Sequence, residues 1–230
     1  MHILILGGTG PSGIELIQQA LEVNHTVVVY ARSPQKLPAH ISSSPSVTVV
    51  AGDLTDREKL SAAMQGVQAV LSVLGPGPSH PSNTPLAQAY QLIIESMKQQ
   101  NVKRLIAVGT PSMKDEHDHF SLIMLAMITV VATFVRNAYK DVVAIGQTIR
   151  AADPEKLVWT IARVPILNDN EDRSVVAGYV GDGKVGTKLA RPALAAFVLR
   201  ELEENQWTLK APAISSPYYA KGGYGSWLFL

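Results

Sequence analysis

The chain has 230 residues, of which 47% are hydrophobic, enough to bury the core of one α/β domain. Lysine and arginine number 20 against 19 acidic residues, so the formal net charge of +1 gives no basis for a nucleic-acid or anionic-membrane partner. The chain contains no cysteine, which excludes disulfides and thiol catalysis. An apolar strand is expected from residue 2, so we expect no cleaved signal and a cytoplasmic protein.

The first predicted strand, residues 2–6, leads directly into the sequence GGTGPSG. Gly7, Gly10 and Gly13 have the spacing G-x-x-G-x-x-G, a variant of the dinucleotide-binding fingerprint, and apolar residues at helical spacing follow from Ile14. Glycines let the backbone approach a pyrophosphate, and the helix N-terminus offers free N–H groups. The predicted pyrophosphate turn contains Gly7, Thr9, Gly10, Pro11, Ser12 and Gly13. By itself, this motif also fits a turn without a ligand.

The second predicted strand, residues 25–30, ends without the acidic residue that would bind a ribose 2′-hydroxyl. Arg32, Ser33 and Lys36 follow instead, giving two cations and a hydroxyl. A guanidinium binds a 2′-phosphate well, whereas a carboxylate would repel it. The sequence therefore predicts NADP(H) rather than NAD(H). The alternative is that these are ordinary solvated loop charges.

Strands and helices alternate through the rest of the first half of the chain. Strands are predicted at 47–51, 69–73 and 104–108, with a helix at about 85–100. Asp53, Leu54, Leu74, Gly75 and Thr110 lie just after these strands. The alternation predicts a Rossmann fold, a doubly wound, mostly parallel sheet with helices on both faces, which binds ligands at the carboxyl ends of its strands.

Four other segments carry separate expectations. The Pro- and Ser-rich stretch 75–85 is expected to form a mobile loop over the cofactor. Residues 120–135 contain no charge but are shorter than a bilayer span of about 20 residues, so we expect a buried or dimer-forming helix. The acidic and histidine-rich segment 114–119 is expected to be a solvated loop, and no metal site is expected. The apolar end, 227–230, is expected to dock on the chain's own substrate pocket or on a partner subunit.

The stretches GGTGPSG, ARSPQKL, VVAGDLTD, VLSVLGPG and VKRLIAVGT, in this order, resemble the atypical short-chain dehydrogenase/reductase superfamily. The nearest branch is the NmrA-like, biliverdin reductase B/flavin reductase type. The resemblance implies one NAD(P)-binding domain over 1–230, with substrate-side elements at about 111–135 and 166–190 and in the tail 217–230. It implies a pyrophosphate at the glycine turn and a 2′-phosphate at Arg32 and Lys36. It further implies adenine beside Asp53 and Leu54 and the nicotinamide ribose beside Leu74 and Gly75, and Val164 and Pro165 still fit the family pattern.

The catalytic residues depart from the family pattern. None of the seven tyrosines has a lysine four residues later, so the usual Tyr-x-x-x-Lys motif is missing. Lys140 has the expected interval to Pro165, but Arg136 then occupies the tyrosine position. Lys140 is a candidate for binding the nicotinamide ribose, while Tyr139 would point to another helix face. Both also fit polar residues at which a buried helix surfaces.

Thr110 stands where the family tends to have serine, so it either hydrogen-bonds a substrate oxygen or caps a turn. Thr110, Tyr139 and Lys140 are accordingly the catalytic candidates.

The missing phenol favours an acceptor that needs no positioned acid. A conjugated acceptor delocalises the arriving charge, and solvent can supply the proton. The sequence therefore predicts an NADPH-dependent oxidoreductase that reduces a flavin, a quinone or a natural-product intermediate by hydride transfer. The alternatives are an NADP-binding redox-sensing regulator and a redox-neutral isomerase or cyclase. The expected partners are a small-molecule substrate and a second copy of the chain, bound through helix 120–135 or the tail.

Overall fold

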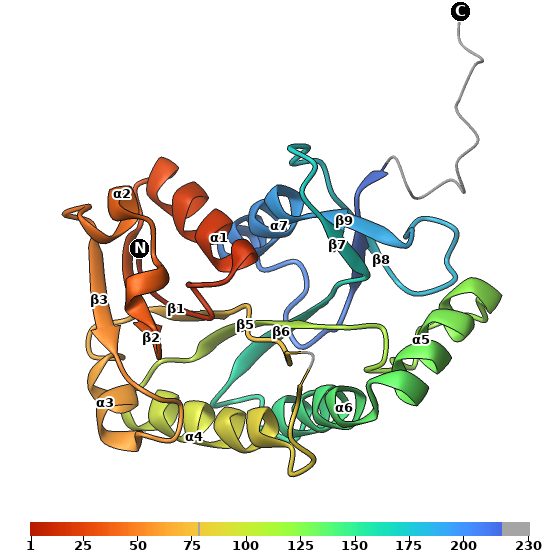
Figure 1. Cartoon of the computed structure of the whole chain (residues 1–230), viewed down its shortest axis with the longest axis horizontal. Coiled ribbons are helices and arrows are strands. Elements are labelled where there is room, and N and C mark those ends of the chain that lie inside the picture. The colour runs from red at the N-terminus through yellow and green to blue at the C-terminus, as the bar shows by residue number, and fades with distance from the viewer. Residues whose placement is uncertain (78, 218–230) are drawn as a thin grey trace, which may run out of the picture.

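The computed structural model describes residues 1–77 and 79–217, which form an α/β fold around one large sheet (Figure 1). The strands are β1 (His2–Leu6), β2 (Thr26–Ala31), β3 (Val47–Ala51), β4 (Ala69–Ser72), β5 (Arg104–Gly109), β6 (Val158–Arg163), β7 (Ile166–Asn168), β8 (Val176–Gly178), β9 (Lys188–Ala190) and β10 (Ala213–Ser215). The helices are α1 (Pro11–Glu22), α2 (Ala39–Ser42), α3 (Arg57–Ala62), α4 (Pro85–Gln99), α5 (Leu122–Phe134), α6 (Arg136–Arg150) and α7 (Arg191–Glu204), with a 3-10 turn at Pro34–Lys36.

The 8-stranded sheet has the order β3-β2-β1-β4-β5-β6-β10-β8. Its strands are parallel except for β8, which pairs antiparallel with β10, and β7 and β9 form a separate parallel pair. The order reverses beside β1, because the chain first builds outward through β2 and β3 and then returns through β4 to β6. This reversal is the topological switch point at which doubly wound sheets bind ligands. The predicted Rossmann architecture is confirmed.

Alternating side chains of each strand build two cores. Ile3 and Ile5 of β1 face the layer of α1 and α7, whereas Leu4 and Leu6 face the layer of α3, α4 and α6. All four side chains are completely buried. A strand that is covered on both faces must be apolar at every position, which is why these residues read as a continuous hydrophobic run.

The uncharged segment 120–135 does not form the buried helix that was one of the two expectations. Only Met124 of α5 is buried, while Phe120, Leu122, Ile123 and Phe134 are 65–81% exposed. The helix stands at the edge of the molecule, next to α6 (Figure 1), because the sheet below it is already covered. Among the described residues, no single helix is long and apolar enough to cross a bilayer. The pair α5 and α6 meets the length and composition criteria together, but the two helices are bent by 115°. The expected docking of the apolar tail lies outside the described residues.

Candidate functional site

The glycine turn joins β1 to α1 at the switch point of the sheet. Gly7 has a φ of +81°, which an L side chain rarely adopts, and a Cβ on Gly13 would lie 2.2 Å from the Gly7 carbonyl oxygen. A Cβ on Gly10, in contrast, would meet nothing closer than 3.6 Å. Gly7 and Gly13 are therefore required by the turn itself, whereas the space beside Gly10 is open.

The N-terminus of α1 is uncapped by any side chain and begins with Pro11. The first helical bond comes from the N–H of Ile14, so the N–H groups of Ser12 and Gly13 have no partner within the helix. Together with the helix dipole, these groups favour an anion at this position.

A cleft with a volume of about 240 Å³ opens beside this turn, and we call it the glycine cleft. It collects nine of the residues that the sequence predicts for the cofactor: Gly7, Thr9, Arg32, Ser33, Lys36, Asp53, Leu54, Leu74 and Gly75. They come from the loops after four different strands and meet because those strands are parallel. Tyr30, Ala31, Gly52 and Leu86 complete the lining.

The two cations of the glycine cleft are available to a ligand. Arg32 and Lys36 are exposed, and neither forms a salt bridge within the described part of the chain. Asp53 lines the same cleft, and hydrogen bonds from the backbone and hydroxyl of Thr55, together with the charge of Arg32, lower its pKa. Among the described residues, the cleft thus offers a guanidinium and an ammonium that form no salt bridge.

Tyr30 forms part of the floor of the cleft, a role that its strand position did not reveal. Its hydroxyl donates a 2.7 Å hydrogen bond to the carbonyl oxygen of Asp53, tying β2 to the loop after β3. Burial, with Asp56 and Asp53 nearby, raises the pKa of Tyr30 to about 12, so the donor remains protonated. Gly52 is required here, because a Cβ would lie 2.2 Å from the Tyr30 hydroxyl. The large aromatic residue at the end of an otherwise aliphatic strand was the available signal.

A second hollow lies at the carboxyl ends of β5 and β6, and we call it the methionine pocket. Its volume is about 140 Å³, and its lining comes from Thr110 to Ser112, from Val164 to Ile166 and from α5. Thr110, Val164 and Pro165, three predicted residues, therefore lie in this pocket and not in the glycine cleft. The two hollows share one edge of the sheet, with β5 three strand spacings, about 14 Å, from β2.

A buried ion pair joins the loop after β5 to the end of β6. Arg163, at the end of β6, has no exposed side-chain surface and binds both carboxylate oxygens of Asp118, at 2.6 and 2.7 Å. Arg163 also donates to the carbonyl oxygens of Met113 and Ala211. A buried guanidinium needs a charged partner, and the loop after β5 supplies it.

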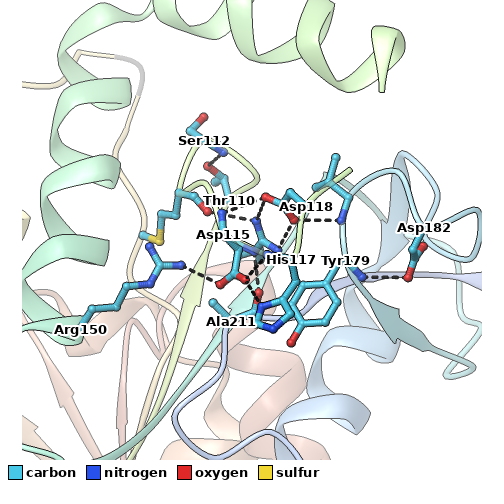
Figure 2. Close-up of polar contacts among 12 residues, drawn as sticks. Thr110, Ser112, Asp115, His117, Asp118, Arg150, Tyr179, Asp182 and Ala211 are labelled. Carbon is cyan, nitrogen blue, oxygen red and sulfur yellow. Dashed lines mark hydrogen bonds and ion pairs between the residues drawn. The ribbon is translucent and has the colours of Figure 1, made fainter. Parts of the chain in front are cut away.

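The expectation of a solvated loop at 114–119 is confirmed for Lys114, Glu116, His117 and His119, which are exposed. It is wrong for Asp118, whose carboxylate pairs with the buried Arg163. Asp118 accepts hydrogen bonds from Asp115 N–H and Val180 N–H, and His117 stacks on Tyr179 with ring centroids 4.7 Å apart. Figure 2 shows Asp115, His117 and Asp118 gathered beside Tyr179, with Arg150 directed toward Asp115. Burial opposes the charge of Asp118, but the hydrogen bonds and charge of Arg163 outweigh it and lower the pKa of Asp118. Across residues 1–77 and 79–217, no group of three or more His, Asp or Glu side chains is placed to hold a metal ion.

Lys140 and Tyr139 lie on the first half of α6. Lys140 is exposed and Tyr139 is half-buried, and neither residue lines the glycine cleft or the methionine pocket as the described residues form them. Asp141, one residue later, is completely buried. It accepts hydrogen bonds at 2.9 and 2.8 Å from the N–H groups of Leu86 and Ala87, at the start of α4.

Asp141 also contacts His80, one residue of the segment that was expected to be a mobile loop. The ring nitrogen Nε2 of His80 lies 2.6 Å from the Asp141 carboxylate, and Asn137 donates to the His80 carbonyl oxygen. Because Leu86 lines the glycine cleft, Asp141 connects α6 to the edge of that cleft. The periodicity of α6 was the missed signal, since Asp141, Ile145 and Ile149 share its buried face.

The residues present fit a nicotinamide dinucleotide. The open backbone at Gly10 and the helix N-terminus suit a pyrophosphate, and Arg32 and Lys36 supply the positive charge that a 2′-phosphate requires.

Comparison with known proteins agrees with this arrangement. A family described as "NAD(P)H-binding" matches residues 7–205. A short-chain dehydrogenase/reductase from Veillonella parvula, solved in complex with NADP, superposes with a TM-score of 0.78 at 17% identity over 97% of this chain and 99% of that one.

Curated relatives match over shorter stretches. The photosystem II assembly factor Ycf39 of Synechocystis is 37% identical over 71 residues, which is 31% of this chain and 21% of the relative. Isoeugenol synthase 1 of Clarkia breweri is 30% identical over 112 residues, covering 45% of this chain and 33% of the relative. The chain thus matches a third or less of the length of these two relatives.

Proposed function

The chain belongs to the NAD(P)H-binding family, and from this premise we propose that it is an NADPH-dependent reductase of a conjugated small molecule. The observation that carries the proposal is the pairing of two hollows on one sheet edge. The glycine cleft has the groups for a phosphorylated dinucleotide, and the methionine pocket lies beside Thr110, farther along the same edge. An acceptor in that pocket would lie at the ends of β5 and β6, whereas the 2′-phosphate would lie at the end of β2, farther along the same edge of the sheet.

The choice of NADPH rests on the end of β2. Arg32 and Lys36 line the cleft without forming a salt bridge in the described residues, and no acidic residue replaces them at the ribose position. A dinucleotide without the 2′-phosphate would leave both cations unpaired.

The side chains near the methionine pocket suit hydride transfer without a dedicated protein acid. When bound, NADPH supplies the hydride from its nicotinamide ring. Thr110 accepts a hydrogen bond from Ser112 N–H at 3.2 Å, which leaves its own hydroxyl proton free to donate to an acceptor oxygen. The side chains of α5 that line the pocket are apolar, and a conjugated acceptor takes its remaining proton from solvent. The exposed Lys140 remains our candidate for the nicotinamide ribose.

The test follows NADPH absorbance with a conjugated single-ring acceptor, tetramethyl-1,4-benzoquinone, and with an isolated ketone, cyclohexanone, as the matched control. We expect NADPH oxidation with the benzoquinone at least about 10²-fold faster than with cyclohexanone, the factor that a positioned acid typically contributes. Comparable rates with both would contradict the reasoning from the missing acid. Failure to bind NADPH would contradict the proposed function as a whole.

A second function is favoured by the exposed face of α5. Phe120, Leu122 and Phe134 are at least 70% exposed and lie in a segment without charges, which is typical of a surface that contacts another protein. A redox-sensing regulator would bind NADPH without oxidising it and would use this face for a partner or for a second copy of the chain. Tight NADPH binding with no turnover of any conjugated acceptor would favour this function.

A further inference from the structure

The methionine pocket differs in chemistry from the glycine cleft. Met124, Met127, Ile128 and Val131 of α5 form one wall, and no charged side chain is present among the described residues that line the pocket. The polar side chains in its lining are those of Thr110 and Ser112, both from the loop after β5. A site of this kind binds an uncharged molecule and orients it by few polar contacts.

The volume of the pocket restricts the ligand further. At about 140 Å³, it is close to the volume of about 150 Å³ at which an apolar cavity accommodates benzene. One six-membered ring therefore fits within the pocket, whereas the three fused rings of a flavin would extend beyond it. The phosphate of a flavin nucleotide would also find no cation among the described lining residues, and burying an unpaired charge is costly. Methionine side chains adapt to rings with different substituents.

The rim of the pocket shows where a larger ligand would continue. Val131 of α5 is 38% exposed and Ile166 of β7 is 55% exposed, and both line the pocket. The pocket therefore opens between two apolar side chains, next to the uncharged outer face of α5. A substituent that leaves through this opening would be covered best if it were apolar.

We propose that the methionine pocket binds the ring of an uncharged, single-ring quinone or enone whose alkyl or prenyl substituent leaves between Val131 and Ile166. This inference rests on the proposed reductase function and names its substrate class. For a quinone, NADPH gives a hydride to the ring system, that is, two electrons and one hydrogen nucleus. One proton from solvent then completes the hydroquinone, and NADP⁺ is released. Thr110 donates a hydrogen bond to one ring oxygen.

The experiment measures binding without turnover. Isothermal titration of the full chain, saturated with NADP⁺, is carried out with a decyl-substituted benzoquinone and with flavin mononucleotide. We expect the quinone to bind and the flavin nucleotide to bind at least about tenfold more weakly, a difference of about 1.4 kcal/mol. Equal or tighter binding of the flavin nucleotide would overturn the assignment.

Two adjacent valines provide the matched variants. Val131→Glu places a carboxylate at the rim, whereas Val130→Glu places it on the same helix at a residue that is 55% exposed and does not line the pocket. We expect Val131→Glu to weaken quinone binding at least about tenfold and Val130→Glu to change it less than about twofold. Both should keep the NADP⁺ affinity. Ile166→Glu repeats the test from β7 should Val131→Glu fail to fold. Equal effects of the two valine variants would overturn the proposed location.

The same proteins separate this inference from the proposed function. Quinone binding that depends on Val131, without NADPH oxidation, would refute the reductase and leave the pocket assignment standing. NADPH oxidation by the flavin nucleotide, with no binding of the quinone, would support a reductase and refute the pocket assignment.

Discussion

Two single-methyl changes in the glycine turn, Gly10→Ala and Gly13→Ala, should separate its contact with a ligand from its role in packing. Gly10 has extended backbone angles (φ −85°, ψ 164°) that alanine adopts freely, and its Cβ would lie 3.6 Å from the nearest atom outside its neighbours. Gly10→Ala should therefore preserve the fold or stabilise it by about 0.4–1 kcal/mol. The added methyl would stand in the space left for the pyrophosphate, so we expect NADPH affinity to fall at least about tenfold, or 1.4 kcal/mol.

Gly13→Ala should act on the fold instead. Its Cβ would lie 2.2 Å from the Gly7 carbonyl oxygen and 2.5 Å from the Gly8 Cα, both backbone atoms that cannot rotate away. The turn and α1 would have to separate by about 0.8 Å to restore a 3.0 Å contact. Overpacking of this kind costs about 1–3 kcal/mol. For a chain of this size the melting temperature should fall by about 2–12 °C.

The assay pairs thermal unfolding, followed by circular dichroism, with titration of NADPH fluorescence. Wild-type NADPH affinity in Gly10→Ala would show that the backbone at Gly10 meets no pyrophosphate. An unchanged melting temperature in Gly13→Ala would refute the packing argument, whatever its NADPH affinity.

Three further predictions concern charged residues. We expect the unaltered protein to bind NADP⁺ at least about tenfold more tightly than NAD⁺, and equal dissociation constants would contradict the NADP assignment. Arg32→Ala should remove most of this preference and leave the NAD⁺ dissociation constant nearly unchanged. If the Lys140 ammonium holds the ribose, Lys140→Ala should weaken NADPH binding by about 1.5–3 kcal/mol, whereas Tyr139→Phe should leave it unchanged. Indistinguishable NADPH titrations of the two variants would remove Lys140 from the site. Because the pKa of Asp118 is lowered on folding, its contribution to stability is complete above the unfolded value of about 4 and disappears as the pH falls through the lower folded value. In urea titrations, the difference between the unaltered protein and Asp118→Asn should therefore shrink as the pH falls below about 4; a difference that stays constant would show that the carboxylate charge does not hold Arg163.

The first half of the molecule could be predicted from local patterns. The apolar run at residues 2–6 predicted β1 with its observed bounds, and the glycines after it predicted the turn into α1. Parallel strands all end at one edge, so residues as distant as Gly7 and Leu74 could be assigned to one site before their contacts were known. No distance information was needed, because the alternation of strands and helices dictates this arrangement.

The tertiary structure decided what neighbouring residues on one helix do. Lys140 and Asp141 are adjacent and both charged, yet the first is exposed and the second is buried against the start of α4. A helix turns by about 100° per residue, so its packing partner determines which side chain is buried. The sequence around 140 does not identify that partner.

The same limit applies to the segments 114–119 and 120–135. The acidic loop appeared suited to solvent, but the buried Arg163 on β6 requires the carboxylate of Asp118. The uncharged helix appeared suited to a core, but the sheet surface is already occupied by α4 and α6, which leaves α5 exposed at the edge. Hydrophobicity and charge determine what a segment can bury. Whether it is buried depends on the space that distant parts of the chain leave for it.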